Sequence, residues 1–266
     1  MPELHSVVCV KVVPKSEEIR VDPKRMVLVR EDVRSEINPP DMNALEIALR
    51  LKDRFGGAVS ILSMGPTSFV PFLKVGAAMG ADHIYLLSDR DFAGADTLAT
   101  TYTLALGIRK LGKVNLVFCG EESADGATGQ VPAGLAEWLD IGQLSMLTEI
   151  DIDTVNSSAR GRREIGGGYE ILEVGMPCVV SVQTACNEPR FMDYDRKSWA
   201  FDDSRVTLWN AEDLDAAPEL IGIHGSPTIV SGLAEAAVRE RRREFIEGTS
   251  EEIAKQVSEI LRQNLT

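Results

Sequence analysis

The sequence has little of the material that builds disulfide frameworks, metal centres or histidine-based catalysis. Its 266 residues include 4 cysteines and 3 histidines. The cysteines Cys9, Cys119, Cys178 and Cys186 are far apart and form no C-x-x-C pair, which argues against both a disulfide framework and a zinc site. We therefore expect reduced thiols and little scope for catalysis by histidine or by a metal.

Long apolar runs and an excess of positive charge are also missing. No apolar run approaches the length of about 20 residues that a transmembrane helix needs. The chain has 28 Lys and Arg against 41 Asp and Glu, a net charge of −13, which argues against binding to nucleic acid. We expect protein or small-molecule partners. The first residues lack the basic region and apolar core of a signal peptide, so we expect a cytoplasmic location.

Familiar nucleotide-binding motifs are missing as well. No G-x-G-x-x-G follows the first apolar run, and no G-x-x-x-x-G-K-[ST] occurs in the chain. The first run leads into Lys11-Val12-Val13-Pro14 rather than into the Ser-Gly-Gly loop of ATP pyrophosphatases. Any nucleotide site must therefore be of another kind.

The first half alternates short apolar runs with amphipathic stretches, the pattern of buried parallel strands connected by helices. Apolar runs at 7–13, 59–63, 84–87 and 114–119 predict strands. Helices are expected from about Asp41, from 68 to 80, from Asp96 and around Val131, and a hairpin over 19–30 turning at Asp22-Pro23-Lys24. With 44% hydrophobic residues, the sequence predicts an α/β fold with a doubly wound, mostly parallel sheet of the Rossmann-like, nucleotide-binding type.

The second half changes to strands and ends in a helical arm. Strands are expected at 148–155, 160–165, 169–174 and 178–182, with a hairpin turn at 166–168. Polar residues from 191 to about 217 predict a surface loop. An exposed helix is expected around 234–247. A last helix opens with the capping box Thr249-x-x-Glu252 and carries an apolar stripe of Ile253, Val257, Ile260 and Leu261.

Small and polar residues gather directly after the four apolar runs of the first half. These segments are 11–14, 63–66, 92–101 and 120–131. Each has an ordinary structural interpretation, such as an N-cap at Asp96 or a turn at Asp125-Gly126. Together they favour a ligand site, because the carboxyl ends of parallel strands meet at one edge of a sheet. Helix N-termini and hydroxyls there suit phosphate, while Asp125 and Gln130 could bond ribose or base.

Longer motifs follow one another along nearly the whole chain. They are Val8-Cys9-Val10-Lys11-x-Val13-Pro14, Asn38-Pro39-x-Asp41-x-Asn43-Ala44-x-Glu46, Gly76-Ala77-Ala78-Met79-Gly80-Ala81-Asp82, Arg163-Glu164-x-x-x-Gly168-x-Glu170, Met176-Pro177-Cys178-Val179-Val180-Ser181, Asn187-Glu188-Pro189-Arg190 and Gly225-Ser226-Pro227-Thr228-x-Val230. In this order they resemble the small (β) subunit of electron-transfer flavoproteins. The resemblance implies a heterodimer with a large (α) subunit, in which flavin carries the redox chemistry.

That family contains two kinds of β subunit. Conventional members hold a structural AMP, with a loop resembling D-D-D-x-N-Q-T-G-Q. Bifurcating members bind a second FAD, with a shorter loop resembling D-G-x-T-x-Q-V and an earlier A-D-T-x-A-T. In this chain the loop sequence is Asp125-Gly126-Ala127-Thr128-Gly129-Gln130-Val131, and the earlier segment is Ala95-Asp96-Thr97-Leu98-Ala99-Thr100. Both segments resemble the bifurcating kind.

The resemblance implies an FAD pocket made by residues from five segments. They are Cys9, Lys11, Asn38, Asp41, Ser63, Met64, Gly65, Pro66, Asp96, Thr97, Thr100, Asp125, Gly126, Ala127, Thr128, Gln130 and Val131. It further implies NADH as electron donor, and as acceptors the large subunit's FAD with a flavin-dependent dehydrogenase, and ferredoxin or flavodoxin. Two alternatives stay open: a conventional carrier that holds AMP, and a nucleotide-binding sensor without electron transfer.

Two segments depart from the family pattern. Gly120-Glu121-Glu122 stands where many relatives have G-K-Q or G-R-Q, which places acidic residues near the expected cofactor. Residues 191–200 also differ, with Phe191, Tyr194 and Trp199 in an otherwise polar stretch. We expect these aromatics to anchor a dehydrogenase-docking loop, the alternative being a small satellite core. We thus expect a flavin-binding domain over 1–190, and over 191–266 a docking loop and an arm that packs on the large subunit.

Overall fold

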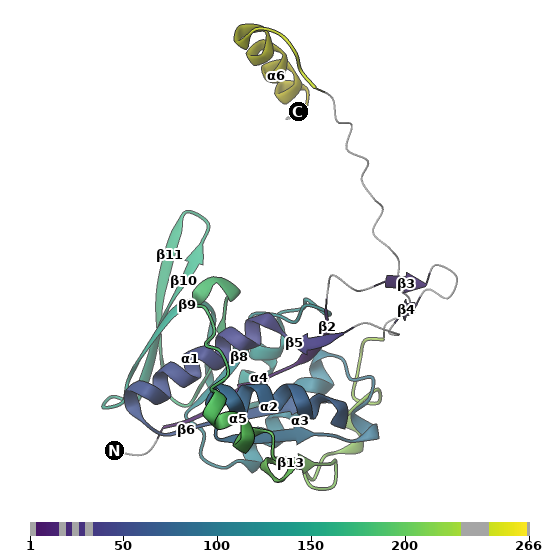
Figure 1. Cartoon of the computed structure of the whole chain (residues 1–266), viewed down its shortest axis with the longest axis vertical. Coiled ribbons are helices and arrows are strands. Elements are labelled where there is room, and N and C mark those ends of the chain that lie inside the picture. The colour runs from purple at the N-terminus through teal and green to yellow at the C-terminus, as the bar shows by residue number, and fades with distance from the viewer. Residues whose placement is uncertain (1–3, 16–19, 23–26, 30–33, 230–244, 265–266) are drawn as a thin grey trace. The chain divides into compact units, whose positions relative to one another are not determined.

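The computed structural model describes residues 4–15, 20–22, 27–29, 34–229 and 245–264. The chain divides into two compact units, one over residues 1–232 and a small one over 233–266 (Figure 1). Among the described residues, no helix is long and apolar enough to cross a membrane.

The first unit is built on a nine-stranded sheet of order β11-β10-β9-β12-β8-β1-β6-β7-β13. Seven neighbouring strands, from β9 to β13 in that order, are parallel, and β10 and β11 add an antiparallel ribbon. The strands are β1 (His5–Cys9), β6 (Ala58–Met64), β7 (His83–Leu87), β8 (Leu116–Gly120), β9 (Gly142–Asp153), β10 (Ser158–Ile165), β11 (Gly168–Gly175), β12 (Cys178–Val182) and β13 (Val206–Trp209). The predicted α/β fold with a mostly parallel sheet is confirmed.

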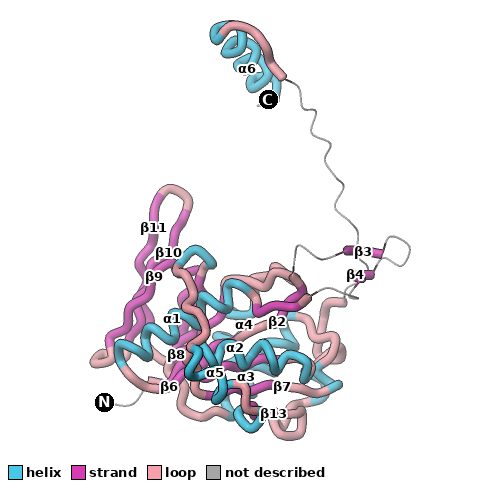
Figure 2. Tube along the Cα trace, in the orientation of Figure 1, coloured by secondary structure: helices cyan, strands magenta, loops and turns pink. Residues whose placement is uncertain are grey.

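Helices cover both faces of the sheet, as Figure 2 shows. Helices α1 (Pro39–Phe55), α2 (Val70–Met79) and α5 (Tyr194–Ala200) pack on one face, and α3 (Thr97–Lys110) and α4 (Val131–Leu139) on the other. Successive strand residues serve the two cores: Val7 packs under α3 and α4, whereas Val8 packs under α1 and α2. Short 3-10 turns occupy Thr67–Phe69, Arg90–Phe92, Thr184–Cys186, Asp203–Arg205 and Pro218–Leu220.

The order of the strands reverses direction between β1 and β8. From β1 the chain moves to β6 and β7 on one side, and later to β8 and β12 on the other. In open α/β sheets such a switch point creates a crevice at the carboxyl ends of the strands, where ligands bind. The segments that the sequence singles out lie at this edge, because each follows one of these strands.

Two small sheets adjoin the end of β1 in the sequence. The predicted strand over 7–13 is in fact two strands, because Lys11 turns the chain out of β1 and into β2 (Val12–Pro14), which pairs with β5 (Ser35–Ile37). The predicted hairpin is present as β3 (Arg20–Asp22) paired with β4 (Val27–Val29). Residues 23–26, which include most of the predicted turn, lie outside the described residues.

The loop predicted over 191–217 contains a helix and an edge strand. Helix α5 rests on α2, and β13 extends the sheet beside β7, with Trp209 stacked on Tyr85 at a centroid distance of 4.7 Å. The sequence did not predict this strand, because its four residues form a short run inside an otherwise polar stretch. Packing therefore continues past the boundary expected at residue 190.

The second unit contains α6 (Ser250–Asn264). Its predicted capping box is confirmed: the Thr249 backbone N–H donates to Glu252 Oε2 (2.8 Å), and the Glu252 N–H donates to Thr249 Oγ1 (3.4 Å). The helix expected over 234–247 falls mainly on 230–244, outside the described residues.

Candidate functional site

The carboxylate of Asp41 joins the ends of two neighbouring strands. It lies in the first turn of α1, and its oxygens accept hydrogen bonds from the backbone N–H groups of Lys11 (2.8 Å) and Gly120 (3.1 Å). Lys11 follows β1 and Gly120 ends β8. A Cβ atom at position 120 would lie 2.5 Å from Asp41 Oδ1, so only glycine fits there. Asp41 thus fixes the backbone on both sides of the switch point.

Asp41 is a buried carboxylate, with 7% of its surface exposed. Burial raises its pKa from 3.8 to about 6, although hydrogen bonds from Lys11, Asn38 and Gly120 lower it. At neutral pH the group is therefore largely ionised, with its charge held by the donors that converge on it.

The side chain of Asn38, just before α1, holds the loop that follows β8. Its amide nitrogen donates to the carbonyl oxygen of Glu122 (2.9 Å), and its oxygen accepts from the N–H of Ala124 (3.0 Å). Two side chains at the start of α1 therefore position this loop. Asn38 holds the loop itself, and Asp41 holds Gly120, the residue from which the loop begins.

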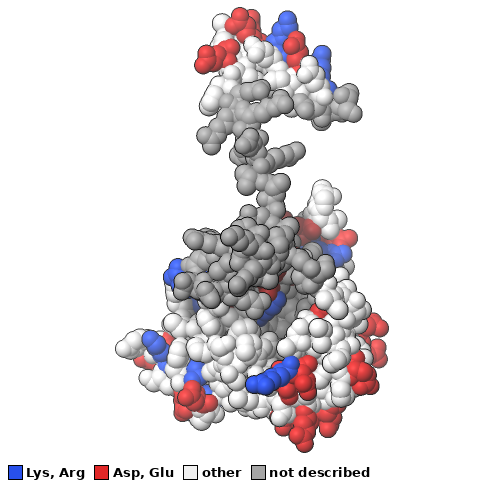
Figure 3. Space-filling model, turned by 90° about the vertical axis from the view of Figure 1, so that its right-hand side faces the viewer, with Lys and Arg blue, Asp and Glu red and all other residues white. Residues whose placement is uncertain are grey.

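A salt bridge crosses the same edge of the sheet. Lys11 Nζ lies 2.6 Å from Asp125 Oδ1 and 3.3 Å from Ser123 Oγ. Burial raises the pKa of Asp125, but the hydrogen bond and charge of Lys11 outweigh burial and lower it. Figure 3 views the molecule from the side of β2 and β5 and shows a hollow with charged side chains of both signs.

Asp96 caps α3 and also holds a distant segment. One carboxylate oxygen accepts from the N–H groups of Leu98 (2.9 Å) and Ala99 (3.2 Å). The other accepts from the N–H (3.1 Å) and hydroxyl (2.7 Å) of Thr228. Because four donors occupy this carboxylate, Asp96 acts here as a positioning group. The adjacent Thr97 hydroxyl donates to Gln130 Oε1 (2.9 Å), which links the starts of α3 and α4.

The segment 63–66, which begins in the last residues of β6, lies beside the end of β1, since Leu62 pairs with Cys9. Its Ser63 Oγ is buried and has no hydrogen-bond partner among the described residues. Buried hydroxyls are normally hydrogen-bonded, so this oxygen is a candidate to bond a ligand. Within the part of the chain that the structure describes, no side-chain hydrogen bond or ion pair connects 63–66 with the loop over 125–131.

The structure therefore brings Lys11, Asn38 and Asp41 into contact with the loop after β8, and Thr97 into contact with Gln130. It also shows positioning residues that the sequence reasoning missed, namely Ser123, Ser226 and Thr228. Ser226 and Thr228 belong to a motif noted in the sequence, but nothing near them indicates Asp96 as their partner, because it lies about 130 residues away.

The acidic departure at Glu121 has a structural partner. Its carboxylate accepts from the N–H (3.2 Å) and hydroxyl (3.1 Å) of Thr184. Glu121 thereby ties the end of β8 to the turn after β12, and Glu122 contributes its backbone carbonyl to Asn38.

A separate groove of about 690 Å³ lies between α1, α2 and the chain after β12. Its lining is mainly apolar and includes Ile37, Met42, Phe72, Val75 and Pro189. None of the residues expected to bind FAD lines it.

The three aromatics of the segment 191–200 differ in exposure. Phe191 is 95% and Tyr194 85% exposed. Trp199 instead packs against the core, with the guanidinium groups of Arg196 and Arg205 each 4.7 Å from its ring centroid. The satellite-core alternative therefore describes Trp199, and the two exposed rings remain available to a partner.

Several hydrogen bonds fix helix α5 against α2 and the residues beside it. The Asp193 N–H donates to the Ala78 carbonyl (2.9 Å), and Arg196 donates to the carbonyl of Ala81 (2.8 Å). The buried Lys74 donates to the carbonyl of Phe201 (3.1 Å) and pairs with Asp203. These bonds hold α5 at both ends.

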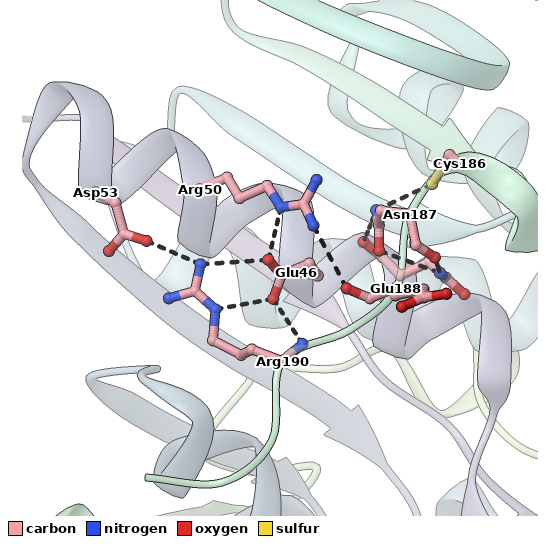
Figure 4. Close-up of polar contacts among 8 residues, drawn as sticks. Glu46, Arg50, Asp53, Cys186, Asn187, Glu188 and Arg190 are labelled. Carbon is pink, nitrogen blue, oxygen red and sulfur yellow. Dashed lines mark hydrogen bonds and ion pairs between the residues drawn. The ribbon is translucent and has the colours of Figure 1, made fainter.

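A charged cluster on α1 fixes the start of the same segment (Figure 4). The buried Glu46 accepts from the backbone N–H (3.0 Å) and Nε (2.8 Å) of Arg190, and from Arg50 Nε (2.6 Å). Burial raises the pKa of Glu46, but the bonds from the two arginines outweigh burial and lower it. One turn earlier, Asn43 donates to the Asn187 carbonyl (2.7 Å).

Comparison with known proteins identifies relatives along nearly the whole chain. Residues 25–207 match the family model described as "Electron transfer flavoprotein domain". The electron transfer flavoprotein subunit beta of Clostridium acetobutylicum is 41% identical over 256 residues, covering 96% of this chain and 94% of the relative. Protein FixA of Azotobacter vinelandii is 42% identical over 250 residues, covering 92% and 88%. Subunit CarD of the caffeyl-CoA reductase-Etf complex of Acetobacterium woodii is 42% identical over 224 residues, covering 84% of each.

The first prediction concerns Asp41. Because its folded-state pKa of about 6 exceeds the unfolded value of 3.8, the folded chain loses stability as the pH rises from about 4 to 6. The loss from this group is about 3 kcal/mol, since each pKa unit is worth about 1.4 kcal/mol. We expect Asp41→Asn to lack this component in urea unfolding across a pH series. The same change at the exposed Asp195 should leave the pH dependence as it is; an unaltered slope in Asp41→Asn would contradict the assignment.

The second prediction concerns Glu46. Glu46→Gln should lower the free energy of unfolding by about 2 kcal/mol, because it weakens several charged hydrogen bonds to Arg190 and Arg50. The pKa of Glu46 is lower in the folded state than in the unfolded state. The stability that the variant loses is therefore lost in full above the unfolded carboxyl's pKa of about 4.3. The difference between variant and wild type disappears as the pH falls through the folded-state pKa of Glu46. Urea midpoints measure it. Glu188→Gln is the control, because Glu188 is exposed and bonds Arg50 only through its backbone; an equal loss in both variants would refute the cluster's role.

Proposed function

Because the chain belongs to the electron transfer flavoprotein family as a β subunit, we propose that it binds FAD at the switch point and takes part in flavin-based electron bifurcation. A large (α) subunit is its partner in the complex, as the relatives imply. The alternative is a conventional β subunit that holds AMP.

The loop between β8 and α4 carries this proposal. Its text, Asp125-Gly126-Ala127-Thr128-Gly129-Gln130-Val131, resembles the shorter loop of bifurcating members. Two of its residues are glycines: a Cβ atom at position 126 would meet only Ser123 Oγ within 4 Å, and Gly129 has a φ of +61°. A short loop with small side chains leaves more room above the strand ends, which supports a ligand larger than AMP.

The groups at this edge fit a flavin nucleotide. Helix α4 begins without a side-chain cap, so its positive end is open to a phosphate, whereas Asp96 already occupies the end of α3. Thr97, Thr100 and Thr128 would add hydroxyl donors, and the unsatisfied Ser63 Oγ supports a missing polar partner. Lys11 and Asp125 would lie at the entrance of this site, where each could form a bond to a ligand in place of their salt bridge.

Bound FAD would supply the hydride and single-electron chemistry that these side chains lack, with NADH as donor and with the large subunit's FAD and ferredoxin or flavodoxin as acceptors. The chain's own residues position and polarise the site. Asp41 holds the two strand ends, Asn38 holds the loop, and the ionised carboxylates keep negative charge near the expected flavin.

We further propose that Phe191 and Tyr194 dock a flavin-dependent dehydrogenase. Tyr194 is the first residue of α5, a helix held at both ends, and Phe191 lies just before it. Exposed rings on such a fixed segment form an anchor that loses little entropy on binding. Trp199, on the side of α5 that faces the core, is not part of the contact surface that we propose.

The third prediction is the cofactor content of the purified heterodimer. We expect two FAD per heterodimer and no stoichiometric AMP, measured by releasing and separating the nucleotides. Thr128→Val should lower occupancy at limiting FAD, because a hydroxyl bond to a charged phosphate contributes about 1.5–3 kcal/mol. Thr207→Val, on the exposed face of β13, is the matched control. One FAD with one AMP would leave the conventional alternative standing.

The fourth prediction is the effect of removing the exposed ring on α5. Tyr194→Ala should weaken electron transfer to the dehydrogenase by about thirtyfold, the equivalent of a 2 kcal/mol interface anchor. Flavin content and NADH oxidation with an artificial acceptor should stay unchanged. Val155→Ala, an exposed apolar residue in the β9–β10 turn, is the control. Unimpaired transfer in Tyr194→Ala would show that docking occurs elsewhere.

A further inference from the structure

Two cysteines stand side by side at the switch point. The parallel ladder between β1 and β8 pairs Val7 with Val117 and Val8 with Phe118, so the next pair in register is Cys9 with Cys119. Neighbouring strands lie about 4.8 Å apart, which is inside the range of about 4.4–6.8 Å between the Cα atoms of a disulfide.

The two side chains also point to the same side of the sheet. Both belong to the core cluster under α3 and α4, and both are buried. Hydrogen bonding to Cys9 is the first cause that raises the pKa of the Cys119 thiol well above 9.0, followed by burial and the nearby charge of Asp41. The strand register and the shared core cluster therefore place the two thiols next to each other, and the raised pKa keeps Cys119 protonated.

We propose that Cys9 and Cys119 form a redox-active dithiol that hydrogen peroxide converts to a disulfide. The Cys9 sulfur attacks one peroxide oxygen, the O–O bond breaks, and the other oxygen leaves as water, which yields a sulfenic acid. The Cys119 sulfur then attacks the Cys9 sulfur, the S–O bond breaks, and a second water carries away the Cys119 proton. Two thiols and one peroxide thus give one disulfide and two waters.

The location of the pair couples this chemistry to the site. Cys119 directly precedes Gly120, and Cys9 lies two residues before Lys11. The backbone N–H groups of Lys11 and Gly120 are the ones that donate to Asp41. A disulfide fixes the separation and torsion of the ends of β1 and β8, which changes the geometry of both hydrogen bonds.

The link to flavin rests on the proposed function, whereas the thiol chemistry does not. Reduced flavins release peroxide when they meet oxygen, so the dithiol would lie next to its own oxidant. Its oxidation would lower the affinity of the site for FAD and stop further peroxide production.

The test treats the reduced heterodimer with hydrogen peroxide, blocks remaining thiols with N-ethylmaleimide after unfolding, and maps non-reduced peptides by mass spectrometry. We expect a Cys9–Cys119 linkage that dithiothreitol reverses. It should be absent from Cys9→Ala and Cys119→Ala and present in Cys178→Ala, whose thiol is equally buried but packs against the opposite face of the sheet. Free thiols at both positions, or links to other cysteines, would overturn the proposal.

A second measurement tests the coupling. FAD affinity of the oxidised wild type should fall about tenfold, or 1.4 kcal/mol, and recover on reduction, while Cys119→Ala shows no response to peroxide. Equal affinity of both redox forms would refute the coupling. A complex that holds only AMP at this site would refute the proposed function and leave the dithiol to be judged by the peptide map.

Discussion

The buried carboxylate of Asp41 is the constraint on which the candidate site depends. The ladder between β1 and β8 ends at Val8 and Phe118, and beyond it the backbone N–H groups of Lys11 and Gly120 donate to a side chain instead of to the neighbouring strand. Asp41 satisfies both, and burial of its charge is the cost, seen in a pKa raised to about 6. The loop after β8 therefore starts from a fixed point, and Asn38 continues the restraint to Ala124.

Little of this arrangement is there to increase stability. Removing a charge from water costs several kcal/mol, and well-packed apolar residues are often more stable than a buried ion pair. These polar groups instead fix positions. Each one bonds a segment that is remote in the sequence and holds that segment in one place. The same reasoning explains Asp96, whose carboxylate serves α3 and Thr228 at once.

The sequence predicts the features that depend on local pattern. Continuous apolar runs located the parallel strands, Asp96 was recognised as an N-cap, and Thr249 with Glu252 as a capping box, because these signals lie within a few residues. Features that depend on remote partners could not be predicted. The four residues of β13 form a short run in a polar stretch, and only their pairing with β7 makes them a strand. Likewise, nothing near Glu46 in the sequence indicates Arg190 as its partner.

Helix α1 connects the site with the segment that precedes α5. Its first turn holds the strand ends through Asp41, and its second and third turns hold the chain after β12 through Asn43 and Glu46. All three side chains are buried on the face of α1 that meets the rest of the fold. The segment before α5 and the loop after β8 are thus tied to one and the same helix. If α5 docks a partner as proposed, that partner would act on a helix that also holds the candidate flavin site.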